Sequence, residues 1–177
     1  MNHAKPAPFT AADPTGEFPL SPGDYVLHLV ASVALFRDAA LNRLLRPQGL
    51  NVGRYRVLGV LARFGRCSMT EVANYTAMER TTLTRIADQL VRAGYVDRTS
   101  SDKDRRQVLL ELTPAGRQAH RPAVMALQGY NSRAMEGVSE AALRETARTL
   151  MAVVDKVAAN RAARDAILVV GRIPLED

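Results

Sequence analysis

The segment from residue 67 to residue 117 constrains the fold of this chain more than any other part of it. Ser68 and Glu71 have the S-x-x-E spacing of a capping box, which predicts a short helix that begins directly after the serine. A second helix is predicted from about Glu79 to Ala93, and Gly94 is its C-terminal stop because glycine adopts a positive φ at little cost. Two short helices separated by a tight turn predict a helix-turn-helix.

The second helix of this pair has one apolar side and one polar side. Its apolar stripe follows the spacing i, i+3, i+4, i+7 and i+8, at Leu83, Ile86, Ala87, Leu90 and Val91. The polar side suits DNA, because arginine can hold guanine bidentately and threonine can reach bases or phosphates. The candidate DNA contacts are Arg80, Thr81, Thr82, Thr84, Arg85 and Gln89. Any surface helix has a polar outer side, however, so this helix alone does not decide between the two interpretations.

A basic hairpin is predicted directly after the second helix. Residues 95–99 and 107–112 suit two short strands, and residues 100–105 are polar turn material. The candidate wing contacts are Arg98, Lys103, Arg105 and Arg106, and Asp104 is close enough to Arg106 to brace it. Cations on a narrow tip are well placed for phosphates or a narrow minor groove. A solvated turn is the alternative, and the position of the hairpin directly after a helix-turn-helix disfavours it.

The order of these motifs resembles the MarR family of bacterial transcriptional regulators. The matching residues are Leu50, Tyr55 and Leu58, then Thr70–Ala73 and Arg80–Arg85, then Gly94–Val96, Asp102, Asp104, Arg106, Leu110, Leu112, Thr113 and Gly116. The resemblance covers roughly residues 24–165, and it departs from the usual pattern at Val72 and Lys103, where leucine and proline are common. It implies a homodimer that binds double-stranded DNA at a pseudo-palindromic operator and often releases it on binding a small-molecule effector.

The segments on either side of the helix-turn-helix predict a mainly α protein. Helix starts are indicated by caps at Ser21, Asn51, Thr113 and Ser139, and the helices should reach about Arg46, Phe64, Met135 and Arg164. Residues 1–20 are rich in proline and predict a flexible N-terminal arm. We therefore expect a winged helix-turn-helix DNA-binding lobe at residues 51–117 and a helical dimerisation region at residues 21–50 and 118–177.

The first and last predicted helices carry more apolar surface than a single helix facing solvent should have. In the last helix these residues form a seam with steps of three and four, at Leu143, Ala147, Leu150, Val154 and Val157. Dimerisation through the N- and C-terminal helices explains this surface, and packing within one subunit is the alternative that the pattern leaves open. A short apolar patch at Ile167–Val170 follows, and its partner is not indicated.

Charge and composition support a DNA-binding lobe in a soluble globular protein. Of the net charge of +6, most lies in residues 51–117, which hold 12 Lys and Arg against 7 Asp and Glu. The chain has no run of 18 apolar residues and no apolar N-terminal segment like a signal peptide, which predicts a cytoplasmic protein without a membrane partner. Cys67 is the single cysteine, and a partly buried small residue is favoured there over a redox sensor.

No motif for catalysis or metal binding is evident. The three histidines have no i, i+4 arrangement for a metal, and no nucleophile elbow, P-loop or H-E-x-x-H motif occurs. We therefore expect no catalytic residue, no metal and no cofactor, and His28 and Tyr55 are the candidates for a ligand cleft. The leading hypothesis is a ligand-responsive repressor that binds an operator. The alternatives are a winged-helix module for protein partners and a ligand-modifying enzyme with a borrowed fold.

Overall fold

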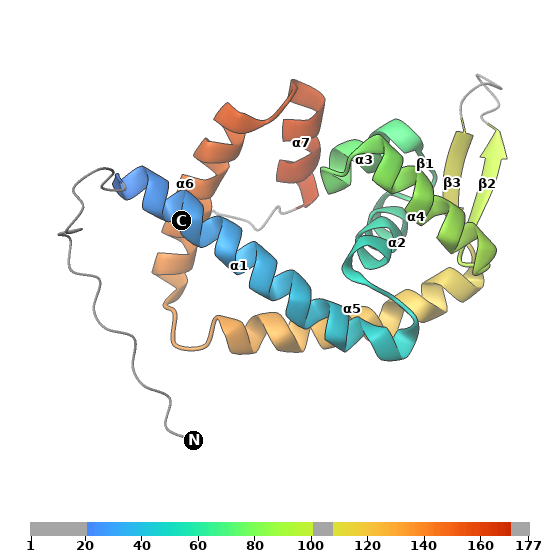
Figure 1. The fold of residues 1–177 in the computed structure, drawn as a ribbon, viewed down its shortest axis with the longest axis horizontal. Coiled ribbons are helices and arrows are strands. Elements are labelled where there is room, and N and C mark those ends of the chain that lie inside the picture. The colour runs from blue at the N-terminus through green and yellow to red at the C-terminus, as the bar shows by residue number, and fades with distance from the viewer. Residues whose placement is uncertain (1–20, 101–107, 171–177) are drawn as a thin grey trace, which may run out of the picture. The chain divides into compact units, whose positions relative to one another are not determined.

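The computed structural model describes residues 21–100 and 108–170, and these are mainly helical (Figure 1). The elements are α1 (Pro22–Leu45), η1 (Arg46–Gln48), α2 (Val52–Phe64), β1 (Cys67–Ser68), α3 (Met69–Thr76), α4 (Arg80–Arg92), β2 (Val96–Ser100), β3 (Val108–Leu112), α5 (Pro114–Ala134), α6 (Glu140–Val157) and α7 (Arg161–Val170). This order confirms a mainly α winged helix-turn-helix. In the described ranges no helix combines the length and hydropathy needed to cross a bilayer.

Helix α1 crosses the boundary between two compact units, Met1–Ala39 and Ala40–Asp177, and the fold described below is that of the second unit. The predicted arm at residues 1–20 and the predicted wing tip, including Lys103, Asp104, Arg105 and Arg106, lie outside the described residues. The division of the chain into an arm, a dimerisation region and a DNA-binding lobe therefore stays a prediction.

The predicted helix starts are confirmed by side-chain caps. Ser68 forms the full capping box, because its backbone N–H donates to Glu71 Oε2 at 2.7 Å and its Oγ accepts from the Glu71 N–H at 3.2 Å. The other caps are Ser21 Oγ accepting from Asp24 N–H, Asn51 Oδ1 from Arg54 N–H, Thr113 Oγ1 from Gly116 N–H and Ser139 Oγ from Ala142 N–H. Each cap satisfies a backbone donor that the first helical turn leaves without a partner, which fixes where the helix begins.

The core of the second unit forms where the apolar stripe of α4 meets α2. Leu83, Ile86, Ala87 and Leu90 of α4 are buried, as predicted, and Val91 packs at the edge of the core. They share this core with Val57, Leu58 and Leu61 of α2. Full burial of one such side chain contributes roughly 1.5–3 kcal/mol to folding. The stripe therefore holds α4 at a fixed rotation about its own axis.

The sheet has three antiparallel strands in the order β1-β3-β2. In its register Val96 pairs with Leu112 and Arg98 with Leu110, and all the apolar partners in these two pairs are buried. Two details differ from the sequence pattern. Val108 shares the side of Leu110 and Leu112 but is exposed, and the strand β1 was not predicted because two residues are too few to show alternation.

The prediction of one continuous last helix from Ser139 to about Arg164 is wrong. Helix α6 ends at Val157, and α7 begins at Arg161 after a three-residue connection at residues 158–160. Asn160 explains the break, because its Oδ1 accepts from the Ala163 N–H at 2.9 Å and so caps a new helix. The apolar patch at Ile167–Val170, whose place the sequence left open, is the last part of α7.

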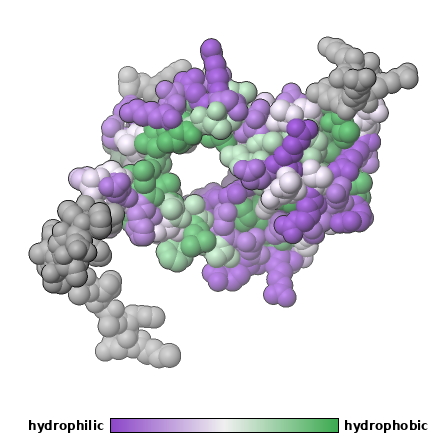
Figure 2. All heavy atoms as spheres, turned by 45° about the horizontal axis from the view of Figure 1, so that its top comes forward, coloured by the Kyte–Doolittle hydropathy of each residue, from purple (hydrophilic) through white to green (hydrophobic). Residues whose placement is uncertain are grey.

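Helix α6 and the first unit keep apolar side chains at the surface. All residues of α6 are described and none is buried, although the helix carries the predicted seam. In the first unit Leu35 and Phe36 are 69% and 71% exposed. Figure 2 shows hydrophobic residues in green on the surface, among the hydrophilic ones. A single helix has no interior of its own, so these side chains need a further element to cover them.

Two glycines of α5 provide a test of the packing between the wing and this helix. A Cβ on Gly116 would lie 2.1 Å from the carbonyl oxygen of Tyr95, whereas a Cβ on Gly129 would meet nothing closer than Arg133 Nη1 at 3.6 Å. We expect Gly116→Ala to lower the free energy of unfolding by about 1–3 kcal/mol or more. Gly129→Ala should be neutral or add up to about 1 kcal/mol, because alanine is the better helix former. Urea unfolding of both variants measures the difference, and equal effects would contradict the close approach.

Candidate nucleic-acid interface and adjoining cavity

The outer side of α4 presents arginine and threonine side chains to solvent. The five predicted contacts on its first two turns are all exposed, namely Arg80, Thr81, Thr82, Thr84 and Arg85. Glu79 at the N-cap makes no side-chain hydrogen bond to the first turn, so no side-chain cap covers the N–H groups at the positive end of the helix dipole. The Thr84 hydroxyl donates to the Arg80 carbonyl oxygen at 2.9 Å, which leaves its oxygen as an acceptor. Burial of the opposite stripe thus produces one continuous donor-rich surface.

Gln89, the sixth predicted contact on this helix, is held by the protein itself. Its Oε1 accepts from Arg54 Nε at 3.3 Å and Arg54 Nη2 at 3.2 Å, and Arg54 Nη1 donates to the Gly49 carbonyl oxygen at 2.9 Å. The two helices also approach closely at Gly53, where a Cβ would lie 2.8 Å from Ile86 Cδ1. Arg54 therefore ties the later turns of α4 to the start of α2, a role that the sequence did not indicate.

The first strand of the wing is joined to α4 by an ion pair. Arg98 Nη1 lies 2.7 Å from Asp88 Oδ1, and the two side chains are 36% and 41% exposed. A pair this exposed adds at most about 1 kcal/mol to stability, but it sets the position of β2 beside α4. Arg98, predicted as a DNA contact, is thus already engaged by a carboxylate. The remaining wing candidates, Lys103, Arg105 and Arg106, and the brace residue Asp104 lie outside the described residues.

A cavity of about 420 Å³ lies behind the helix-turn-helix, between α2, α3, α5 and α7. Two aromatic pairs form its walls, Tyr55 with His120 at 5.2 Å between ring centroids and Phe64 with Tyr75 at 4.2 Å. Arg56 and Arg63 add cations to the lining. Tyr55, predicted to line a ligand cleft, lies in this wall. His28, the other predicted cleft residue, belongs to the first unit, which is described separately.

His120 is a polar residue of the cavity that the sequence analysis did not predict. Its Nε2 is buried and has no hydrogen-bond partner among the described residues. Burial lowers the pKa of His120 below its usual 6.5, so the imidazole is neutral near pH 7 and can donate or accept one hydrogen bond. The missing side chain of Gly59 leaves room beside it, since a Cβ there would lie 3.5 Å from Nε2. A buried nitrogen without a partner is a place where a ligand polar atom gains a hydrogen bond at no loss to the protein.

Cys67 lies in β1 and is 3% exposed, so it is a small residue that is more fully buried than predicted. Burial raises the pKa of the Cys67 thiol, and the Glu71 carboxylate raises it further. Both effects disfavour the reactive thiolate. No group of three or more His, Cys, Asp or Glu residues suited to a metal ion occurs in the described part of the chain.

The lowered pKa of His120 predicts a specific sensitivity to acid. As the pH falls below about 6.5, the unfolded chain takes up a proton on this imidazole before the folded chain does. The stabilising contribution is therefore present above that pH and is lost as the pH falls through the folded pKa. We expect His120→Gln to lose less free energy of unfolding than the parent chain between pH 7.5 and 5.5, as measured by urea unfolding. His28→Gln is the control, and a parallel pH dependence of parent and His120→Gln would contradict the assignment.

Comparisons with known proteins agree with this geometry. A protein-family model described as MarR family matches residues 48–107. The chain is 28% identical to the HTH-type transcriptional repressor IacR of Pseudomonas putida over 130 residues, which cover 73% of this chain and 78% of IacR. It is 35% identical to the HTH-type transcriptional repressor YetL of Bacillus subtilis over 72 residues, which cover 40% of this chain and only 43% of YetL.

A solved structure extends the likeness over most of the chain. CouR from Rhodococcus jostii RHA1, solved bound to p-coumaroyl-CoA, matches with a TM-score of 0.67 and 26% identity, covering 74% of this chain and 92% of CouR. The family match falls on α2, the helix-turn-helix and the first wing strand, where the motifs of the sequence lie. The fold, the family model and the curated repressors agree, and together they support a winged-helix transcriptional regulator similar to the MarR family.

Proposed function

We propose that this chain is a homodimeric transcriptional regulator that represses by binding a pseudo-palindromic operator and releases it when a small effector binds. The observation that carries this proposal is the exposed surface of arginine and threonine on α4, backed by a buried stripe on the same helix. Such a helix enters a major groove with its N-terminal residues at the base edges. Arg80 and Arg85 are suited to bidentate contacts with guanine, and Thr81 and Thr82 to phosphates or bases.

The wing follows the recognition helix onto the flanking DNA. The ion pair between Arg98 and Asp88 sets β2 beside α4, so a hairpin tip that extends from β2 and β3 would reach the sugar-phosphate backbone next to the groove. We assign the phosphate contacts to Lys103, Arg105 and Arg106, with Asp104 bracing Arg106. These contacts add affinity without sequence preference, whereas those of α4 select the sequence.

Two copies of the chain are needed to cover an operator. The apolar seam of α6, with no buried residue on that helix, and the exposed apolar side chains of α1 support a partner of the same kind. Two-fold symmetry places the two α4 helices about one helical turn of DNA apart, ~10 base pairs between half-site centres. This arrangement accounts for the N- and C-terminal helices as a dimerisation region.

The cavity behind the helix-turn-helix is the proposed effector site. Its aromatic walls and two arginines suit a planar, anionic molecule, and His120 Nε2 offers that molecule a hydrogen bond. CouR was solved with p-coumaroyl-CoA, which carries a planar aromatic group, and a planar aromatic anion is the class of effector proposed here. An effector that favours a different separation of the two α4 helices would weaken operator binding by a coupling of about 1–3 kcal/mol. His28 and Tyr55 remain the residues predicted for the cleft.

Two other functions have less support. A module for protein partners does not need arginine on both the helix and the wing, and an enzyme needs a catalytic constellation that the cavity does not offer among the described residues. We further propose a cytoplasmic location, since an operator-binding protein acts where the chromosome lies.

Arginine substitutions separate the two kinds of DNA contact. Arg85→Ala should cost roughly 1–3 kcal/mol of operator affinity and relax sequence preference, because it removes a base contact. Arg105→Ala should weaken binding to all sequences alike and reduce the slope of log K against log salt by about one, because it removes a phosphate contact. Gel-shift titrations at several salt concentrations, on DNA selected from a random duplex pool, measure both quantities.

Arg133→Ala, which removes an exposed arginine from the end of α5, is the control for charge loss and should leave both quantities unchanged. If Arg85→Ala and Arg105→Ala bound the operator as tightly as the parent chain, the assigned surfaces would be wrong. If the parent chain ignored duplex DNA at low salt but captured a protein partner, the protein-module alternative would replace this proposal.

A further inference from the structure

Helix α7 packs along α3, the first helix of the helix-turn-helix (Figure 1). The side chains on that side of α7 follow the spacing i, i+3, i+4 and i+7, at Ala162, Asp165, Ala166 and Val169, and they share a groove with Glu71, Asn74 and Tyr75 of α3. Ala166 is buried at this contact, and its small side chain lets the two helices approach. The last described helix is thus docked on the helix-turn-helix that is proposed to bind DNA.

The same helix forms one wall of the cavity. Ile167 lines the cavity together with Phe64 and Tyr75, which belong to α2 and α3. The Val169 carbonyl oxygen accepts a hydrogen bond from Arg63 Nη2 at 3.2 Å, which ties the later part of α7 to α2. Tyr75 lines both the cavity and the groove under α7, so the two spaces are neighbours.

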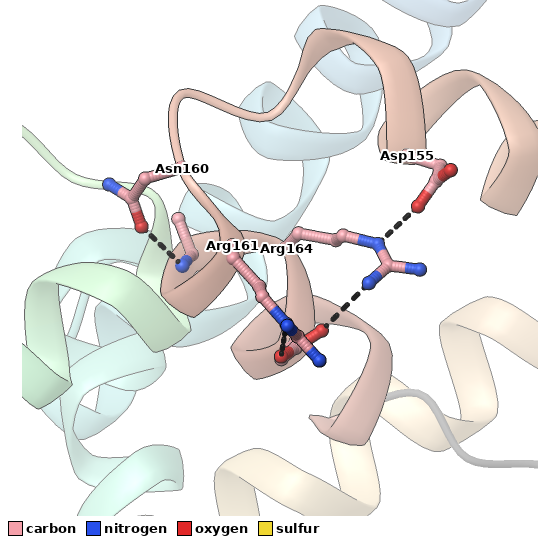
Figure 3. Close-up of polar contacts among 6 residues, drawn as sticks. Asp155, Asn160, Arg161 and Arg164 are labelled. Carbon is pink, nitrogen blue, oxygen red and sulfur yellow. Dashed lines mark hydrogen bonds and ion pairs between the residues drawn. The ribbon is translucent and has the colours of Figure 1, made fainter.

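The start of α7 is anchored to α6 by an ion pair between Arg164 and Asp155 of α6 (Figure 3). Within α7, Arg164 lies 3.1 Å from Asp165, and Arg161 lies 3.7 Å from the same carboxylate. The Asn160 cap begins α7 only three residues after α6 ends. This elbow fixes the direction in which α7 leaves α6. The chain therefore runs from α6, through the elbow, to α3 with a firm contact at each end.

We propose that α7 is a strap that closes the cavity and joins α6 to α3, so that a molecule entering the cavity displaces α7 and loosens the helix-turn-helix. This proposal rests on the proposed function, because it names α7 as the element through which the effector acts. Its physical basis is separate: Ile167 occupies the wall that a bulky ligand would push, and Ala166 is the residue that loses its contact when α7 moves.

Hydrogen–deuterium exchange of the full-length protein tests the docking directly. Ala166→Glu places a carboxylate in the contact opposite Glu71, and Ala152→Glu on the exposed side of α6 is the matched control. We expect Ala166→Glu to speed amide exchange in α3 and α7 by about tenfold or more, because an unpaired charge is poorly tolerated in a helix contact. Exchange in the core of α4 should stay as in the parent chain, and Ala152→Glu should change none of these rates.

A reporter in the cavity wall tests closure by α7. The chain has no tryptophan, so Ile167→Trp supplies a single emitting indole on α7. The probe is 8-anilinonaphthalene-1-sulfonate, an aromatic anion that accepts energy from tryptophan. We expect saturable quenching of the indole by this probe, and faster exchange of α3 amides in the probe complex. Ala166→Ser, a mild change, covers the case in which Ala166→Glu fails to fold, and should raise α3 exchange in the same direction but less.

The outcomes separate this proposal from the proposed function. Unchanged α3 exchange in both Ala166 variants, or quenching that never saturates, would overturn the strap whether or not the protein binds DNA. Faster α3 exchange together with saturable quenching would support it, even if gel shifts of the parent chain showed no operator binding and the proposed function fell.

Discussion

The packing of α4 on α2 is the interaction on which the rest of the structure depends. The contact is made by the buried stripe Leu83, Ile86, Ala87 and Leu90 against Val57, Leu58 and Leu61. Because successive helical residues are about 100° apart, fixing this stripe also fixes the direction in which the opposite residues point. The outward orientation of Arg80 and Arg85 is therefore a consequence of leucine burial. A change in the core that rotated α4 would misdirect the arginines without touching them.

Local signals made most of the fold predictable from the sequence. The capping box at Ser68 and Glu71, the stripe of α4 and the stop at Gly94 each involve residues a few positions apart, and each is found as expected. The exposed residues of the recognition surface follow from the same spacing. The break between α6 and α7 was missed although Asn160 signals it, because the apolar pattern continues past the asparagine and suggests one helix.

The contacts that bind these elements together were not predictable, for a physical reason. Arg54 and Gln89, like Tyr55 and His120, meet only after α2 has packed on α4 and α5, and no spacing in the chain connects such pairs. Asp88 and Arg98 are closer in sequence, but a turn and a change from helix to strand separate them. No sequence pattern indicated that His120 lines a cavity, because a lone histidine becomes informative only when its surroundings are known.

Helix α2 contacts both the cavity and α4, through neighbouring residues. Arg54 reaches Gln89 of α4, while Tyr55 and Arg56 line the cavity. The close approach of Gly53 to Ile86 leaves little room for α2 and α4 to move relative to each other. If a bound ligand shifted the first turn of α2, the shift would therefore be passed directly to α4. This path is separate from the proposed displacement of α7, which acts on α3.

The two-residue strand β1 links the wing to the helix-turn-helix. Ser68 pairs with β3 of the wing and at the same time caps α3, while Arg98 holds β2 against α4, so the wing is tied to both helices. A DNA-binding surface linked in this way adjusts little to the DNA duplex. Any mismatch in shape between the two has to be absorbed by bending or twisting of the duplex. The cost of that deformation depends on the base steps involved, so the preferred operator would be selected partly by bases that no side chain touches.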